Sequence, residues 1–153
     1  VTSYGKGAID RSVVNECLKR GWKVIADPHI TDPPETFIGV YGITPNRIED
    51  DHGKYWMQEG RFPRCCLKLD ADGMSVRDER GQPSHFESIA RKPFDTCGCG
   101  DQVLATIGVM LSRGYDWHES CRVANIAAGL KCTKRGTTPV TRDELEQAME
   151  RNV

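Results

Sequence analysis

The chain has 153 residues, enough for one hydrophobic core, so we expect a single domain over residues 1–153. Charged residues make up 28% of it and the net charge is −1, which gives no electrostatic reason to expect binding to nucleic acid or to an anionic membrane. No apolar run approaches the length of a membrane span and no signal-peptide pattern opens the chain, so we expect a cytoplasmic protein.

The first part of the chain has the pattern of a strand, a helix and a second strand. Val1–Tyr4 is typical of the end of a strand, and Asp10 is typical of an N-cap. Apolar residues at helical spacing then predict a helix that runs to Arg20. Trp22–Ala26 predicts a short strand, which Asp27 ends. This order predicts a βαβ unit with parallel strands.

Further strands and helices alternate along the rest of the chain. Asn46 can cap a helix that runs towards Glu59. Strands are predicted at Val40–Ile43, Arg64–Leu69, Met74–Arg77 and around His85–Ile89, and the last helices at Asp101–Arg113, Trp117–Thr133 and Thr141–Arg151. We therefore predict an α/β fold with a mostly parallel sheet and helices packed on it.

Seven cysteines are an odd number, which rules out a complete set of disulfides within one chain. The spacing of Cys65 and Cys66, or of Cys97 and Cys99, gives at most half of a metal site, because no histidine or second cysteine pair supports it. We expect reduced and mostly buried thiols. A thiol- or metal-dependent site at Cys97 and Cys99 remains a third possibility for function.

The run from Asp95 to Asp101 carries the strongest chemical signal. Gly98 and Gly100 flank Cys99, and Asp101 follows where a helix begins. Glycines tolerate the backbone angles that direct several N–H groups at one point, and a helix start adds unpaired donors and a positive dipole end. This geometry favours a phosphate, with Asp101 as acceptor of a hydroxyl proton. The alternative is a tight turn into the helix with Asp101 acting only as a cap.

These residues resemble the C-terminal signature of the ribokinase-like carbohydrate kinases, in which Ala usually stands at the position of Cys99. Four more segments occur in the family's order: Ser3–Gly7, Val24–Pro28, Thr44–Glu49 and Ala124–Gly129. Together they look most like the kinase half of the bacterial heptose 7-phosphate kinase and ADP-heptose synthesis enzymes. The resemblance covers nearly the whole chain, but only the family's C-terminal half; it implies a three-layer α/β fold with helices on both faces, without the lid and N-terminal half.

The resemblance implies roles for the glycine turn and for a second motif. Asp101 would be the catalytic base, and Gly98, Cys99 and Gly100 would form the anion hole. Asn46-x-x-Glu49 matches the family's motif that organises Mg²⁺ and phosphates. The alternative is that Asn46 caps a helix and Glu49 completes a capping box, and both interpretations can hold together.

Nucleotide contacts are implied for two further segments. Lys68, Asp70 and Gly73 resemble a nucleotide-contact turn, although Asp70 replaces the family's first glycine and a carboxylate repels phosphates. A plain hairpin turn is the alternative. Asn125 matches a position beside the nucleotide base, and an Asn packed between apolar neighbours is the alternative.

We expect an ATP-dependent sugar kinase, or its nucleotide-binding half, with ATP and Mg²⁺ as cofactors and a phosphorylated heptose as acceptor. The alternative is a non-catalytic nucleotide-binding or assembly module derived from such a kinase. The expected partners are a nucleotide and a phosphorylated sugar, together with a second copy of the chain or a missing N-terminal half. The sugar's identity, the activity without a lid and the oligomeric state are left open by the sequence.

Overall fold

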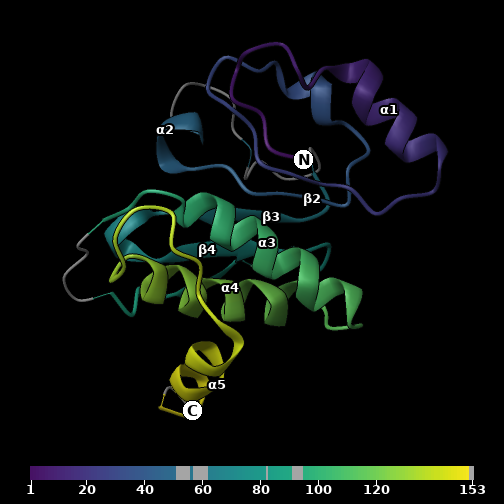
Figure 1. Ribbon diagram of the computed structural model, residues 1–153. Coiled ribbons are helices and arrows are strands. Elements are labelled where there is room, and N and C mark those ends of the chain that lie inside the picture. Colours follow the sequence, from purple (N-terminus) through teal and green to yellow (C-terminus); the bar gives the residue numbers. More distant parts are fainter. Residues whose placement is uncertain (51–55, 57–61, 82, 91–94, 152–153) are drawn as a thin grey trace. The chain divides into compact units, whose positions relative to one another are not determined.

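The computed structural model describes residues 1–50, 56, 62–81, 83–90 and 95–151 (Figure 1). The chain divides into unit 1, which comprises Val1–Asp70 and Ser75–Ser84, and unit 2, which comprises Ala71–Met74 and His85–Val153. The expectation of one domain over residues 1–153 stays a prediction. In order, the elements are α1 (Arg11–Lys19), β1 (Ile25–Ala26), η1 (Pro34–Phe37), β2 (Gly42–Ile43), α2 (Arg47–Glu49), β3 (Cys65–Lys68), η3 (Asp70–Asp72), β4 (Met74–Arg77), β5 (Ser84–Phe86), α3 (Cys99–Ser112), α4 (Trp117–Lys131) and α5 (Arg142–Arg151).

The strands form one sheet in the order β1-β2-β3-β4-β5. β1 pairs with β2 in parallel, with Ala26 opposite Ile43, and β2 pairs with β3 in parallel, with Ile43 opposite Cys65. Only a few residues connect β3 to β4 and β4 to β5, too few for a parallel crossover, so these pairs are antiparallel. The α/β class is confirmed, and the sheet is mixed, with its parallel part at β1–β3.

The start of the chain forms as its sequence predicts. The Asp10 carboxylate accepts hydrogen bonds from the N–H groups of Ser12 (2.9 Å) and Val13 (3.0 Å), which caps α1. Thr2 forms an isolated parallel bridge with Asp27, beside β1. The predicted continuation of the helix at Asn46 towards Glu59 lies mostly outside the described residues.

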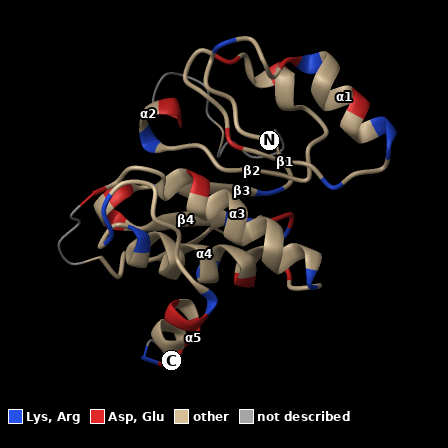
Figure 2. Ribbon diagram, in the orientation of Figure 1, with Lys and Arg blue, Asp and Glu red and all other residues tan. Residues whose placement is uncertain are grey.

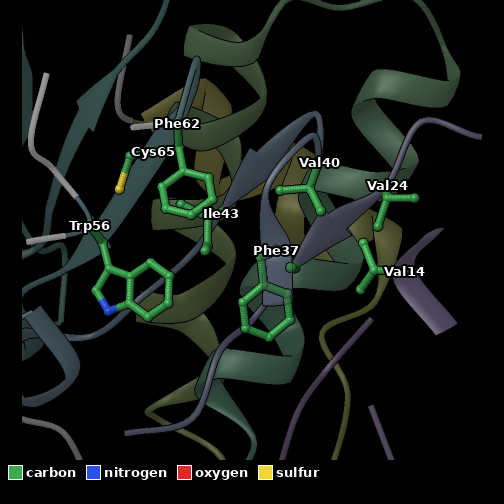
Figure 3. Close-up of a cluster of buried hydrophobic side chains, with 9 residues drawn as sticks. Val14, Val24, Phe37, Val40, Ile43, Trp56, Phe62 and Cys65 are labelled. Carbon is green, nitrogen blue, oxygen red and sulfur yellow. The ribbon is translucent and has the colours of Figure 1, made fainter. Parts of the chain in front are cut away.

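The core of unit 1 is an aromatic and aliphatic cluster (Figure 3). The Trp56 ring lies with its centroid 6.2 Å from that of Phe37 and 5.5 Å from that of Phe62, in tilted arrangements that favour aromatic pairs. The Trp56 ring N–H donates to the Glu49 carbonyl (3.2 Å), so the buried polar atom is satisfied. The aliphatic members of the cluster are Val14, Val24, Ala26, Val40 and Ile43. This core fixes the strand ends that carry the polar residues described below.

Unit 2 is built around the packing of α3 against α4, with α5 packed on α4. The apolar face of α3 is buried at Val103, Ile107 and Leu111. Gly129 lets α4 approach the segment after β5, because a Cβ atom there would lie 2.2 Å from the Ile89 side chain. Positive and negative side chains both occur on α1 and on α5 (Figure 2). In the part of the chain that the structure describes, no helix is both long enough and apolar enough to cross a bilayer.

Candidate functional site

The carboxyl ends of the three parallel strands gather polar residues in unit 1. Asp27 follows β1, Asn46 follows β2, and Lys68 ends β3. Asn46 and Lys68 are linked by a parallel bridge, and the Lys68 ammonium lies 2.6 Å from Oδ1 of Asp27. The Thr44 hydroxyl donates to the same oxygen (2.8 Å). Open parallel sheets bind ligands beyond this edge, so the topology places these residues where a site is expected.

Asn46 and Glu49 form the capping box that was one of the two interpretations of their spacing. Oδ1 of Asn46 accepts the Glu49 N–H (2.9 Å), and Oε2 of Glu49 accepts the Asn46 N–H (2.7 Å). Glu49 is only 8% exposed. Burial raises the pKa of its carboxyl, against the opposing effects of the Asn46 N–H and the nearby Lys68 ammonium. A buried carboxylate without an ion pair in the described part of the chain favours a cation at this position.

The donor set around Glu49 fits Mg²⁺ held through water and phosphate oxygens. Mg²⁺ usually keeps several waters and takes one or two carboxylates together with substrate phosphates. One Glu49 oxygen is engaged in the capping box, and the Asp27 carboxylate is balanced by Lys68. Among the described residues no cluster of three or more metal-ligating side chains exists, so these residues alone do not form a closed protein cage.

The glycine turn of unit 2 leads directly into α3. Gly98 is its N-cap and has the left-handed φ of +75°, which a glycine adopts without strain. The Cys99 N–H donates to the Thr96 carbonyl (3.1 Å), so this amide belongs to an internal turn. The N–H groups of Gly98 and Gly100 have no acceptor in the described part of the chain. Asp101 lies in the first turn of α3 and its residue is exposed. Two open amides therefore stand at a helix start, next to an exposed acidic residue.

A buried lysine that the sequence analysis missed lies against this turn. Lys131, at the end of α4, is only 2% exposed, and its ammonium donates to the Gly136 carbonyl. A Cβ atom on Gly98 would lie 3.5 Å from Cε of Lys131, so the side chain passes close to the turn. Its positive charge also contributes to lowering the pKa of the Asp95 carboxyl. A lysine on the core face of a helix is the only sequence signal that could have indicated this position.

Asp95 connects the same turn to the segment after α4. Its carboxylate accepts the N–H groups of Cys97 (2.9 Å) and Gly136 (2.7 Å), and these bonds lower the pKa of the Asp95 carboxyl. Gly136 therefore accepts a hydrogen bond from Lys131 on its carbonyl oxygen and donates one from its own N–H to Asp95. This network fixes the backbone just before the two open amides.

The predicted nucleotide-contact turn keeps a backbone suited to glycine. Asp70 has φ +54°, and it is the one non-glycine residue with positive φ in the described ranges. Gly73 has φ +86°, and a Cβ atom there would lie 2.0 Å from the Phe86 carbonyl oxygen. Only glycine fits at position 73. The positive φ at position 70 explains why a glycine would suit it too, as the resemblance implies.

Asn125 is buried in α4, and its amide donates to the Glu87 carbonyl (2.8 Å). This bond ties α4 to the segment after β5, as expected of an Asn packed between helix neighbours. The nucleotide roles of Lys68, Asp70, Gly73 and Asn125 stay predictions, as do those of Asn46, Glu49, Gly98, Cys99, Gly100 and Asp101. Within unit 1 the structure brings together the polar residues at the strand ends, and within unit 2 it brings the glycine turn close to Lys131.

A mixed α/β sheet with polar residues at the carboxyl ends of its parallel strands is typical of α/β proteins that bind ligands at that edge. Residues 50–144 match the model of the pfkB family carbohydrate kinases. The chain therefore belongs to the pfkB family of carbohydrate kinases. The expectation of a ribokinase-like sugar kinase family is confirmed.

Two relatives and one solved structure illustrate the similarity. The chain is 32% identical to the bifunctional protein HldE of Methylobacillus flagellatus, over 98% of this chain and 34% of the relative. It is 33% identical to a D-beta-D-heptose 7-phosphate kinase of Bordetella bronchiseptica, over 95% of this chain and 51% of the relative. An Arabidopsis thaliana ribokinase, solved with ribose and ATP, is 22% identical with a TM-score of 0.77, over 92% of this chain and 51% of that one. The fold is therefore ribokinase-like, and the chain spans about a third to a half of these proteins.

Proposed function

We propose that this chain is the nucleotide-binding part of an ATP-dependent kinase that phosphorylates a sugar phosphate of the heptose class. The observation that carries the proposal is the pair of open amides at Gly98 and Gly100, at the start of α3 and next to the exposed Asp101. The heptose 7-phosphate kinase of Bordetella bronchiseptica supports the acceptor class. A kinase that draws on the ATP pool would work in the cytoplasm.

In the proposed reaction, Asp101 accepts the proton of the acceptor hydroxyl as its oxygen attacks the terminal phosphorus of ATP. The oxygen–phosphorus bond forms while the bond to the leaving ADP breaks. The amides of Gly98 and Gly100 and the positive end of the α3 dipole would stabilise the negative charge that the moving phosphoryl group carries. The buried Lys131 ammonium would add positive charge to the same position. Thr96 holds the Cys99 amide, and so fixes the turn between the two donors.

In unit 1, Glu49 and Asn46 would hold Mg²⁺ through water or through the nucleotide phosphates. The ion, when bound, neutralises phosphate charge and makes the phosphorus more susceptible to attack. Lys68 pairs directly with Asp27, so Glu49 is the carboxylate of this cluster that has no ion pair among the described residues. Lys68, Asp70, Gly73 and Asn125 remain the proposed nucleotide-binding residues.

The test compares Asp101→Asn with a matched control, Asp143→Asn. Both residues are exposed acids in the first turn of a helix, so both substitutions remove a similar favourable dipole interaction, about 0.3 to 1 kcal/mol. Phosphoryl transfer from ATP to a heptose 7-phosphate would be followed by product chromatography, and MgATP binding by calorimetry. We expect Asp101→Asn to lower turnover by a factor of about 10² or more with little change in ATP affinity, and Asp143→Asn to leave both unchanged.

Two results would count against the proposal in different ways. Equal turnover in Asp101→Asn would remove Asp101 as the base. ATP binding by the unsubstituted chain without any transfer would instead favour the non-catalytic module. The specific observation behind that alternative is Asp70, a carboxylate in place of the glycine expected at a nucleotide turn.

A further inference from the structure

Two thiols meet between the start of α3 and the end of α4. Sγ of Cys99 lies 2.9 Å from Sγ of Cys132. Cys99 is the first residue of α3 and Cys132 is the C-cap of α4, and both are partly exposed. Sγ of Cys99 also lies 4.0 Å from the carbonyl oxygens of Asp95 and Ala128. Fixed helix ends therefore hold the two sulfur atoms side by side.

We infer that Cys99 and Cys132 form a reversible disulfide, and that this disulfide weakens anion binding at the glycine turn. The co-reactant is a small disulfide of the glutathione class. The thiolate of one cysteine attacks a sulfur of the small disulfide, which gives a mixed disulfide and releases one thiol. The second cysteine then attacks the protein sulfur of the mixed disulfide and releases the second thiol. Two protein thiols are oxidised to one disulfide, and one small disulfide is reduced to two thiols.

The Cys99 thiol is a poor nucleophile for the first attack. Burial and the adjacent Cys132 thiol raise the pKa of the Cys99 thiol to about 12, and only a thiolate is an effective nucleophile. Cys99 reacts in the second step, when Cys132 is part of the mixed disulfide and already lies in contact with it. The Lys131 ammonium lies on the same helix end and favours the thiolate form of Cys99, against the effect of burial.

The link to nucleotide binding rests on the proposed function. A disulfide has an S–S length of about 2.05 Å, so closure brings the two sulfur atoms about 0.9 Å nearer to each other. Cys99 lies between Gly98 and Gly100, whose open amides form the proposed anion hole. A displacement of the Cys99 backbone therefore moves both donors, and shifts of this size at a phosphate site lower affinity strongly.

The chemical arm of the experiment uses the whole chain in buffers with increasing ratios of oxidised to reduced glutathione. Free thiols are blocked with N-ethylmaleimide under native conditions, and peptides are mapped by mass spectrometry. We expect a Cys99–Cys132 linked peptide in the unsubstituted chain and in the control Cys97→Ser, whose exposed thiol lies outside the pair. Cys132→Ser should give no linked peptide. Blocked thiols at both Cys99 and Cys132 in fully oxidised glutathione would overturn the inference.

The binding arm measures MgATP affinity by calorimetry on the reduced and oxidised chain, with circular dichroism to confirm that both are folded. We expect oxidation to weaken binding about tenfold in the unsubstituted chain and in Cys97→Ser, and to have no effect in Cys132→Ser. An unchanged affinity in the oxidised chain would overturn the regulatory part. Absence of binding in the reduced chain would refute the proposed function and the regulatory part together, whereas the linked peptide, which is measured without nucleotide, decides separately whether the disulfide forms.

Discussion

Replacing Lys68 by Met should destabilise unit 1 by about 2 to 3 kcal/mol. The substitution keeps much of the side-chain volume but removes the ammonium, which lies 2.6 Å from Oδ1 of Asp27. The side chains of Lys68 and Asp27 are only 15% and 12% exposed. Removing one partner of a fully buried pair costs about 3 to 5 kcal/mol, whereas an exposed pair is worth about 1 kcal/mol or less. The Thr44 hydroxyl still donates to Asp27, which places the expected cost below the upper range.

Urea denaturation followed by circular dichroism measures this cost, with a double-mutant cycle as its control. Asp27→Asn removes the charge that Lys68 balances, so Lys68→Met in that background should cost less than in the unsubstituted chain. We expect the summed losses of unfolding free energy in the two single variants to exceed the loss in the double variant by about 1 to 3 kcal/mol. An additive double variant would mean that the two charges do not interact appreciably, and that their short distance contributes nothing to stability.

Two further substitutions separate stability from ligand binding. Asp70→Gly should raise the free energy of unfolding by about 1 kcal/mol, because φ +54° is strained for a residue with a Cβ atom. If the turn contacts phosphates, the substitution should also strengthen ATP binding. Thermal unfolding measures the first effect and calorimetry the second. Glu49→Gln keeps an acceptor for the Asn46 N–H but removes the buried charge. Because the folded-state pKa of Glu49 is raised, the unsubstituted chain should lose stability relative to Glu49→Gln as the pH rises from below 4.5 through that pKa. Mg²⁺-dependent ATP binding should weaken in the variant. A pH-independent difference in unfolding free energy between the two proteins would contradict the first expectation.

Local patterns predicted the elements well where a cap or a turn set their limits. Asp10 caps α1, Asn46 and Glu49 form the capping box, and β4 occupies Met74–Arg77 as predicted. The short helix η1 was not predicted, and it begins in a proline-rich segment because Pro34 supplies a helical φ at its first position. Apolar composition alone does not show where strand pairing stops, so the predicted strand at Trp22–Ala26 is paired only at its last two residues.

The sequence did not predict contacts between residues that are far apart in the chain. Lys68 and Asp27 are 41 positions apart, and neither local pattern indicates that one balances the other. Lys131 stands in the last turn of a helix, where a lysine usually interacts with the dipole from solvent. Its burial comes from the path of the chain through Gly136, which covers the ammonium. The sequence therefore indicated the residue types of the site but not their charge balance.

The charge balance differs between the two candidate clusters, and this difference bears on the ligand. In unit 1 the carboxylate of Glu49 is buried and lacks an ion pair among the described residues, so a cation would relieve its desolvation. In unit 2 the Lys131 ammonium is buried near two open amides, so an anion would relieve that cluster. A purely structural module would have no reason to keep a buried charge of either sign, since well-packed apolar residues are often as stable. A cation is therefore the ligand that the charge balance favours at the unit 1 cluster, and an anion is the ligand that it favours at the unit 2 cluster.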